Sequence, residues 1–387
     1  MVAAGIQQQL SSLQSRGLLR RRRILESPQG AHVCVDGRDY VAFCSNDYLG
    51  LANHPALVAA AVEGARLHGV GAGASHLVSG HSAAHEEFER AAARFVGMSS
   101  ALLFSSGYLA NIGVVSALMG REDEVFADKL NHASLNDAAL LSRAKFTRYA
   151  HLDLAALERL LGASHARRKM VATDAVFSMD GDIAPLPQIL ALCERFDAWL
   201  LVDDAHGFGV LGEHGRGSLS HFRLASEQII YMATLGKSAG VCGAFVAGAA
   251  DVAQLLVNRA RSYIYTTAMP PLLARALCTS LSLIEADDWR RRHLAELIAA
   301  FRKGLDKRGW KLLPSDTAIQ PLLVGENAAA LAASAQLAQQ SILVPAIRPP
   351  TVPQGTARLR VSLSAAHDAA DVDRLLAALR EIQPHSP

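Results

Sequence analysis

Residues 198–217 read AWLLVDDAHGFGVLGEHGRG, and this stretch decides the fold class. An apolar run of strand length ends in Asp203, Asp204 and His206, and glycines follow. A short buried strand that ends in polar residues and glycine-rich loops is typical of a parallel sheet whose carboxyl edge holds a ligand. We therefore expect a strand here with polar side chains at its end.

Outward from this stretch, short apolar runs alternate with amphipathic ones. The runs expected to be buried strands are 101–104, 125–127, 170–177, 198–204, 229–234 and 243–248. Helical patterns at 152–161 and 186–196 lie between some of them. This alternation predicts an α/β fold, with a mostly parallel sheet covered on both faces.

The pattern changes after Pro270-Pro271. Long helical stretches (272–309) precede a strand-like run (318–325), a helix (327–340), two further strand-like runs (341–347, 357–364) and a last helix (369–382). This order suits a smaller α+β lobe. We expect an N-terminal segment at 1–45, a large α/β domain at 46–280 and a small C-terminal α+β domain at 281–387.

Composition narrows the class of protein. The 387 residues carry a formal net charge of +2, which gives no general reason for nucleic-acid or membrane binding, and the run Arg20–Arg23 is typical of a solvated helical face. Five scattered cysteines without a CxxC pair indicate a reducing compartment. The N-terminus is polar and no apolar run reaches membrane-spanning length. We expect a cytoplasmic protein.

Polar groups follow three expected strands. Asp203 and His206 follow one, Lys237 follows the next, and Ser178 follows a third. Taken singly, each is as typical of a helix cap or turn as of a site. Because carboxyl ends of parallel strands meet at one edge, four such groups together favour a ligand site.

Lys237 stands apart from the other lysines because its neighbours in ATLGKSAG (233–240) are small and uncharged. Desolvation disfavours the charged form of an amine, and a neutral amine is a nucleophile able to form a Schiff base with a carbonyl. A structural lysine or a simple phosphate contact is the alternative.

Two further motifs border the same edge. FSSGYLAN (104–111) follows a strand and opens a helical pattern, so backbone N–H groups near Gly107 could hold an anion. In NHAS (131–134), His132 is either a buried structural histidine or an aromatic plate against a flat cofactor. The residues alone do not choose.

Two other patterns are set aside. GVGAGA (69–74) has loose dinucleotide-binding spacing but follows a helical stretch instead of a strand. His81 and His85 have the i, i+4 spacing of a helical metal pair, yet the HExxH pattern and a third ligand are missing. We expect neither an NAD site nor a metal site.

A carboxylate, a Schiff-base lysine, a stacking imidazole and an anion cradle together suit pyridoxal 5′-phosphate. Several motifs within residues 45–245 also resemble the α-oxoamine synthase family of pyridoxal-phosphate-dependent acyltransferases, in an aspartate aminotransferase-like fold (PLP fold type I). These motifs are SNDYLGL, GAGASHLVSG, NHASL, VFSMDGD, VDDAHGFGVLGEHGRG and TLGKSAG.

The resemblance implies a role for each matching residue at the cofactor. Lys237 would carry the cofactor and then remove the Cα proton of the amino acid, while Asp203 would keep the pyridine nitrogen protonated. Ser178 and His206 would bind the ring 3′-oxygen, and His132 would stack on the ring and help to place the substrate. The phosphate would be held by Gly107, Tyr108 and Thr234, with Thr266 or Thr267 reaching the phosphate of a partner subunit. The implied assembly is a homodimer with shared active sites.

The resemblance also implies substrate contacts. Arg360 would clamp the amino acid carboxylate, and Thr351 and Arg20 match substrate-contacting positions, although four consecutive arginines leave the register of Arg20 open. Asp174 stands where relatives often carry glutamate, so its role is open as well.

The C-terminal stretch AIRPPTVPQGTARLRVSLSAAH (346–367) is most similar to the family member that joins L-alanine to a pimeloyl thioester in biotin biosynthesis. The implied reaction releases CO2 and a free thiol. The sister reactions of the family, glycine with acetyl-CoA or with succinyl-CoA, are the alternatives. Coenzyme A and an acyl carrier protein both remain open as the acyl carrier.

Overall fold

The computed structural model describes residues 2–305 and 310–382. The chain forms two compact units. Unit 1 comprises Met1–Tyr48, Met179–Asp182 and Arg292–Pro387, and unit 2 comprises Leu49–Ser178 and Ile183–Arg291. Each unit is described by itself.

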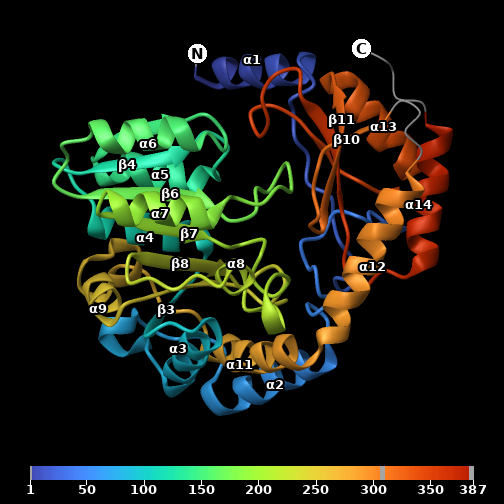
Figure 1. Cartoon of the computed structure of the whole chain (residues 1–387). Helices are drawn as coiled ribbons and strands as arrows, with labels where there is room; N and C mark the ends of the chain where they lie inside the picture. The colour runs from blue at the N-terminus through green and yellow to red at the C-terminus, as the bar shows by residue number, and fades with distance from the viewer. Residues whose placement is uncertain (1, 306–309, 383–387) are drawn as a thin grey trace. The chain divides into compact units, whose positions relative to one another are not determined.

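Unit 2 is built on one sheet, in which seven strands of the described residues take the order β3-β9-β8-β7-β6-β4-β5. The strands are β3 (Ser100–Phe104), β4 (Glu124–Asp128), β5 (Lys145–Tyr149), β6 (Lys169–Asp174), β7 (Ala198–Asp203), β8 (Ile229–Thr234) and β9 (Ala244–Gly248). Only β9 pairs antiparallel with its neighbours, so the other strands run in one direction. The labels β4, β6, β7 and β8 in Figure 1 follow this order. Their carboxyl ends therefore share one edge.

Helices cover both faces of this sheet. They are α2 (Pro55–His68), α3 (Ala83–Val96), α4 (Gly107–Leu118), α5 (Ala133–Ser142), α6 (Leu154–Ala163), α7 (Leu186–Arg195), α8 (Ser218–Phe222), α9 (Ala250–Arg259), α10 (Arg261–Ile264) and α11 (Pro271–Ala286), with a π-helix at His76–Gly80 and a 3-10 turn at Glu213–Gly215. Successive strand residues point to opposite faces, so Leu200 joins the apolar cluster that includes α3 and α7, and Leu201 joins the one that includes α4 and α5. Two cores result, one on each face.

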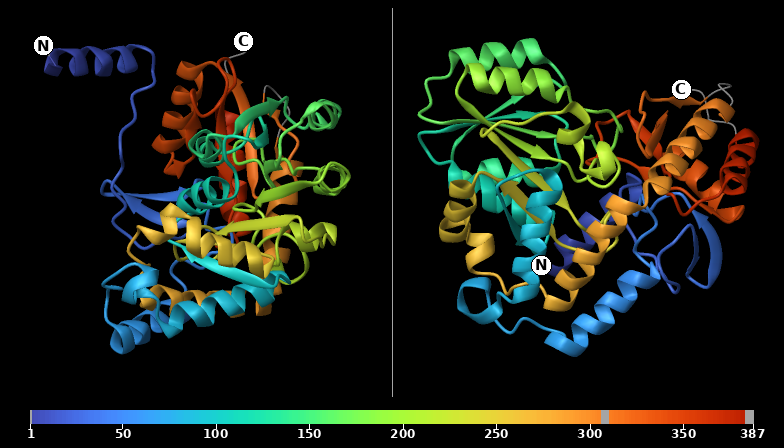
Figure 2. Two further views of the ribbon diagram at one scale, coloured as in Figure 1. Left: turned by 90° about the vertical axis from the view of Figure 1, so that its left-hand side faces the viewer. Right: turned by 60° about the horizontal axis from the view of Figure 1, so that its bottom comes forward.

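Helices α2 and α11 pack closely within unit 2. The right-hand view of Figure 2 shows them side by side. A Cβ added at Gly64 of α2 would lie 2.8 Å from the Cα of Leu272 in α11, so the close approach depends on glycine at this position.

Unit 1 contains two small sheets. One has the order β10-β11-β14-β13 and the other β1-β2-β12. The strands are β1 (His32–Val35), β2 (Arg38–Ala42), β10 (Lys311–Leu312), β11 (Ile319–Gly325), β12 (Ile342–Leu343), β13 (Ala346–Ile347) and β14 (Ala357–Ser362); the helices are α1 (Val2–Ser15), α12 (Asp288–Gly304, which begins in unit 2), α13 (Asn327–Gln339) and α14 (Ala369–Glu381). The antiparallel pair β11–β14 is the centre of the larger sheet.

The division into units differs in three places from the one expected. One is that Met179–Asp182, expected in the large domain, belong to unit 1. The N-terminal residues join the C-terminal ones, because β2 pairs with β12. The expected boundary at 280 falls inside α11, whereas the units divide at 291/292, after that helix has packed on α2. Residues 306–309 of the expected helical stretch lie outside the described residues.

A smaller difference concerns a single element. Strand β5 was not expected, since its sequence KFTRY mixes charged and apolar residues at the edge of the sheet. Among the described residues, none of the helices combines the length and apolar character that a membrane span requires.

Candidate active site

A cavity of about 160 Å³ lies at the carboxyl edge of the unit 2 sheet. Its lining residues come from the ends of β6, β7 and β8 and from the starts of α4 and α5. They include all eight residues expected at the cofactor, namely Gly107, Tyr108, His132, Ser178, Asp203, His206, Thr234 and Lys237, together with Ser134, Asp174, Ala205 and Met232. These residues thus line one cavity at the carboxyl edge of the sheet.

Lys237 lies in the loop between β8 and β9 and is half-buried. Its Nζ is 2.8 Å from Nε2 of His206, which follows β7. The adjacent strands β7 and β8 thus hold an amine and an imidazole in hydrogen-bond contact at the cavity wall.

Asp203 is almost fully buried at the end of β7. Its Oδ2 accepts a 2.7 Å hydrogen bond from Nδ2 of Asn111, and its Oδ1 accepts one from the backbone N–H of Ala205 at 3.1 Å. A buried carboxylate that receives such hydrogen bonds is fixed in orientation.

The same amide group of Asn111 connects Asp203 to His132. Asn111 Nδ2 also donates to Ser134 Oγ at 2.9 Å, so the Ser134 hydroxyl proton is directed to His132 Nδ1, 2.7 Å away. His132 Nδ1 is then an acceptor, and burial lowers the pKa of the imidazole, with the Lys237 charge adding to this and Asp203 opposing it. The neutral ring therefore carries its proton on Nε2.

Asp174 ends β6 next to Asp203 in the register of the sheet. Burial raises the pKa of the Asp174 carboxyl well above its usual range, and the nearby Asp203 charge raises it further. Asp174 Oδ2 accepts the backbone N–H of His132 at 2.7 Å. Asp174 thereby contacts the backbone at the start of α5.

The start of α4 lies at the wall of the cavity, where the sequence predicts an anion site. Ser106 is the N-cap, and its Oγ accepts from the N–H of Leu109 at 3.3 Å. Gly107 adds no side chain at the cavity wall, while Thr234 Oγ1 currently donates to the carbonyl of Gly243 at 3.1 Å and must turn to meet an anion. The Tyr108 hydroxyl donates to Asp137.

Of the expected substrate residues, His132 lies in unit 2, and Arg20, Thr351 and Arg360 lie in unit 1. Arg360 on β14 is buried, and its Nη1 donates to Ser362 Oγ at 2.8 Å and to Asn46 Oδ1 at 3.2 Å. Its Nη2 lies 3.4 Å from the Tyr48 hydroxyl. The guanidinium is held in one orientation by oxygens from the SNDYLGL motif and from its own strand.

Arg20 and Thr351 lie together, although 331 residues separate them in sequence. Arg20 Nη2 donates to Thr351 Oγ1 at 3.0 Å. Within the run Arg20–Arg23, this contact distinguishes Arg20 as the arginine that meets the second expected substrate residue.

Sequence reasoning missed Asn111 and Ser134. Both lie inside motifs that were quoted, FSSGYLAN and NHAS, but neither received a role. The signal was the type of residue: Asn111 is a fully buried amide in a helix whose other buried residues are apolar or glycine. Such an amide needs hydrogen-bond partners, and the partners come from other strands and helices.

A family model described as "Aminotransferase class I and II" matches residues 38–379. Among curated proteins, the chain is 64% identical to an 8-amino-7-oxononanoate synthase of Nitrosospira multiformis, over 98% of this chain and 96% of the relative. It is 62% identical to the enzyme of the same name from Nitrosomonas europaea, over 98% and 99%.

Solved structures agree in fold. A serine palmitoyltransferase from S. paucimobilis has a TM-score of 0.92 and 29% identity, with 98% of this chain and 96% of that chain covered. An 8-amino-7-oxononanoate synthase from Francisella tularensis has a TM-score of 0.77 and 31% identity, with 88% and 97% covered. The expected α/β fold is confirmed, and the chain is a member of the aminotransferase class I and II family.

Proposed function

We propose that this chain condenses L-alanine with a pimeloyl thioester to give 8-amino-7-oxononanoate, CO2 and a free thiol, in biotin biosynthesis. The observation that carries the proposal is the 57–64% identity, over nearly the whole chain, to proteins that bear the name of that synthase. Pyridoxal 5′-phosphate is the proposed cofactor.

The cavity residues fit this cofactor chemically. One amine, two imidazoles and the buried carboxylate of Asp203, with the Asp174 carboxyl beside it, face a cavity of about 160 Å³ next to a helix N-terminus. The carboxylate suits a protonated pyridine nitrogen, the amine suits an aldehyde, and the helix N-terminus suits a phosphate. When bound, the cofactor supplies an electron sink for negative charge at the substrate Cα.

The chain's own residues supply the remaining functions. Lys237 would hold the cofactor aldehyde and, after the amino group of alanine displaces it, accept the Cα proton, with His206 next to its amine. Asp203 would hold the proton of the pyridine nitrogen, its orientation fixed by Asn111. Gly107, Tyr108 and Thr234 would bind the phosphate, and Ser178 with His206 the ring oxygen.

His132 would act as a hydrogen-bond donor. Because Ser134 occupies Nδ1, the Nε2–H is the group that the ring offers to a substrate oxygen. In the bond-forming step, alanine Cα joins the thioester carbonyl carbon and the thiolate leaves. The carboxyl group then departs as CO2 and Cα is reprotonated, for which Lys237 holds the abstracted proton.

Arg360 would bind the alanine carboxylate, since a guanidinium offers two parallel N–H donors. Arg20 and Thr351, which contact one another, would bind the acyl substrate. We propose that the thiol carrier is coenzyme A or an acyl carrier protein and that the enzyme works in the cytoplasm.

We propose further that the enzyme is a homodimer with shared active sites. Val70, Val78 and Tyr265 are 79%, 78% and 71% exposed, and the backbone near Tyr265 is joined to the same loop by a bridge between Ser75 and Thr267. Exposed apolar side chains in one region are typical of an interface. Thr266 and Thr267 lie in this region and would contact the partner's phosphate.

The role of Lys237 is tested by Lys237→Ala, with Lys129→Ala as the control at an exposed site. Borohydride reduction and peptide mapping by mass spectrometry should place the cofactor mass on the Lys237 peptide in the wild type and the control alone. Turnover of Lys237→Ala should fall by at least about a thousandfold, because nucleophile and base are lost together. Unchanged turnover would refute the mechanism.

The substrate is tested by mass-monitored turnover of pimeloyl thioesters with alanine, glycine and serine in parallel. One methyl group in an apolar pocket separates alanine from glycine by about 1–3 kcal/mol, so alanine should be preferred about tenfold or more. If glycine with acetyl-CoA or succinyl-CoA reacted faster, a sister activity of the α-oxoamine synthases would replace the proposal.

A further inference from the structure

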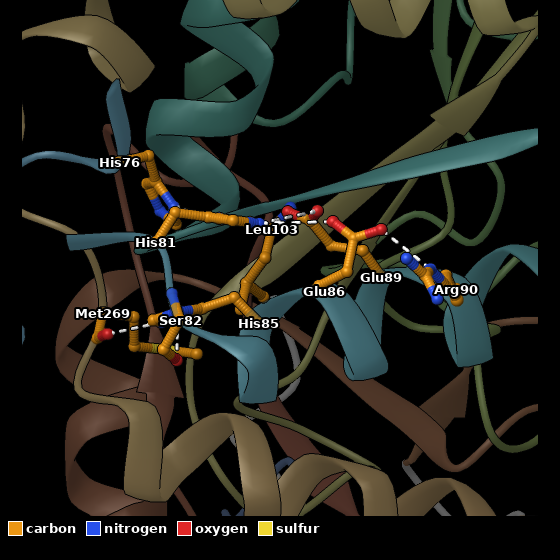
Figure 3. A network of polar contacts seen from close by, with 9 residues as sticks. All are labelled: His76, His81, Ser82, His85, Glu86, Glu89, Arg90, Leu103 and Met269. Carbon is orange, nitrogen blue, oxygen red and sulfur yellow. Dashed lines mark hydrogen bonds and ion pairs between the residues drawn. The ribbon is translucent and has the colours of Figure 1, made fainter. Parts of the chain in front are cut away.

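Three histidines of unit 2 converge outside the cavity just described. His76 starts the π-helix His76–Gly80, His81 follows it, and His85 lies in the first turn of α3. Figure 3 shows this group, with the rings of His76 and His81 turned toward one another. One ring nitrogen of each histidine lies within 4.8 Å of those of the other two. The ring centroids are 5.1–5.5 Å apart.

The lone pairs of these rings are directed by their other contacts. His76 Nδ1 and His81 Nδ1 are 2.9 Å apart. His85 Nε2 donates to the carbonyl of Met269 at 2.7 Å, so its proton is on Nε2 and its Nδ1 carries the lone pair. The backbone N–H and the hydroxyl of Ser82 contact that Nδ1 at 3.0 and 2.9 Å.

The outer contacts follow the pattern of metal-ligating histidines. Such histidines donate their second ring N–H to a carboxylate or a backbone carbonyl. His85 does so to Met269, and His81 Nε2 lies 3.4 Å from Glu86 Oε2, whose other oxygen is held by Arg90. Figure 3 shows both outer contacts.

The ionisation of the rings is also suitable, since a ligand imidazole must be neutral. Burial lowers the pKa of His76 to about 4, and the neighbouring histidines add to this. Burial likewise lowers the pKa of His85. His76 is held in place by stacking on Tyr263, with ring centroids 4.5 Å apart.

We propose that His76, His81 and His85 form a binding site for one divalent transition-metal ion, with zinc preferred and water as the fourth ligand. Zinc–nitrogen bonds of about 2.0–2.1 Å in a tetrahedron bring ligand atoms to about 3.3 Å from one another. His76 Nδ1 and His81 Nδ1 are 2.9 Å apart, and the ligand atoms of all three histidines lie within 4.8 Å of one another. The ion replaces the hydrogen bond between His76 and His81 and the Ser82 contacts to His85. This inference is independent of the proposed function.

Metal binding would link two segments that already touch. Ala268 donates its N–H to the carbonyl of Ala74 at 2.9 Å, and Met269 accepts from His85. An ion on the three histidines ties residues 76–81 to α3 and, through His85, to this second segment. Zinc should therefore raise the thermal midpoint of the holoenzyme.

The test is titration of the holoenzyme with zinc chloride by calorimetry, in phosphate-free buffer after removal of metals with a chelator and dialysis. We expect one zinc ion per chain. His76→Asn and His81→Asn should each weaken binding by about tenfold or more, since each removes one ligand. The exposed His165 lies outside the cluster, so His165→Asn serves as the control and should bind as the wild type does.

A second readout identifies the ligands and separates ligation from misfolding. The cobalt complex should show tetrahedral bands without thiolate charge transfer, because the ligands are imidazoles. Without metal, His76→Asn and His81→Asn should unfold within a few degrees of the wild type. Binding that survives in the double variant His76→Asn/His81→Asn, a thiolate band, or no saturation up to about 100 µM zinc would overturn the proposal.

Discussion

At the residue scale, Asn111 is the group on which two functional side chains depend. Its amide donates both to Asp203 and, through Ser134, toward His132. One side chain therefore fixes the carboxylate at the proposed pyridine nitrogen and the tautomer of the imidazole.

Replacement of Asn111 by alanine removes a hydrogen bond to a charged group, worth about 1.5–3 kcal/mol. We expect kcat and cofactor affinity to fall by about 10–100-fold and the pH profile of kcat to shift, because Asp203 and His132 lose their fixed states. Asn258→Ala, at a surface amide that bonds only locally in the described contacts, is the control. Steady-state kinetics and cofactor titration measure the effect. A change in thermal stability alone would show that Asn111 is merely structural.

Asp204, next to Asp203, predicts a pH dependence of stability. It is fully buried, and burial raises the pKa of its carboxyl to about 7 even though Ser218 N–H and the Tyr231 hydroxyl donate to Oδ2. The unfolded value is about 3.9. Between these values the native state binds the extra proton, so stability present below about pH 4 is lost as pH rises toward 7.

The comparison is with Asp204→Asn, which keeps an acceptor oxygen and removes the titration. The free energy of unfolding of the wild type, relative to the variant, should decrease from pH 4 to pH 7 by up to about 1.4 kcal/mol per unit and then level off. Denaturant unfolding at several pH values measures this. Parallel curves for the two proteins would contradict the assignment.

At the element scale, the contact of α2 with α11 depends on the absence of a side chain at Gly64. A methyl group there would lie 2.8 Å from Leu272 Cα, a backbone atom that cannot move alone. Overpacking costs about 1–3 kcal/mol, against a gain in helix propensity of about 1 kcal/mol. Gly64→Ala should therefore be neutral to destabilising, by up to about 2 kcal/mol.

Gly162 on α6 is the matched control, because its added Cβ would meet only Phe196 ring atoms at 3.5 Å or more. Gly162→Ala should stabilise the protein by about 0.5–1 kcal/mol through propensity alone. Thermal and denaturant unfolding compare the two variants. If Gly64→Ala stabilised as much as Gly162→Ala, the helices could separate without cost.

At the scale of the whole molecule, shared active sites predict complementation between inactive subunits. Lys237→Ala and the double variant Thr266→Ala/Thr267→Ala should each be impaired alone. In a mixed dimer one site receives Lys237 from one subunit and both threonines from the other. With random pairing, about one quarter of wild-type activity should return on co-expression.

The readout is activity per chain, together with the mass in solution by light scattering. A dimer without recovered activity would show that the threonines serve their own subunit. If the protein were a monomer at all concentrations, the proposal of shared active sites would be wrong.

Much of the large unit followed from local sequence. Buried strands such as IIYMAT can be predicted from sequence because a strand covered on both faces is apolar throughout. The polar residues that follow these strands lie at one edge of the sheet because parallel strands end there. The motifs then placed Lys237, Asp203 and His206 at the cavity. Strand β5 was not predicted because an edge strand with one open face tolerates the lysine and arginine of KFTRY, and its sequence therefore lacks a continuous apolar run.

Tertiary structure alone decided the partners of these residues. The pairing of β2 with β12, the contact of Arg20 with Thr351 and the gathering of His76 with His81 and His85 all join residues whose sequence neighbours give no sign of the contact. Periodicity and motif spacing report whether a side chain is buried and which way the chain turns. Which groups then meet depends on how helices and strands pack. The position of the proton on the His132 ring and the raised pKa of Asp174 depend on the same packing.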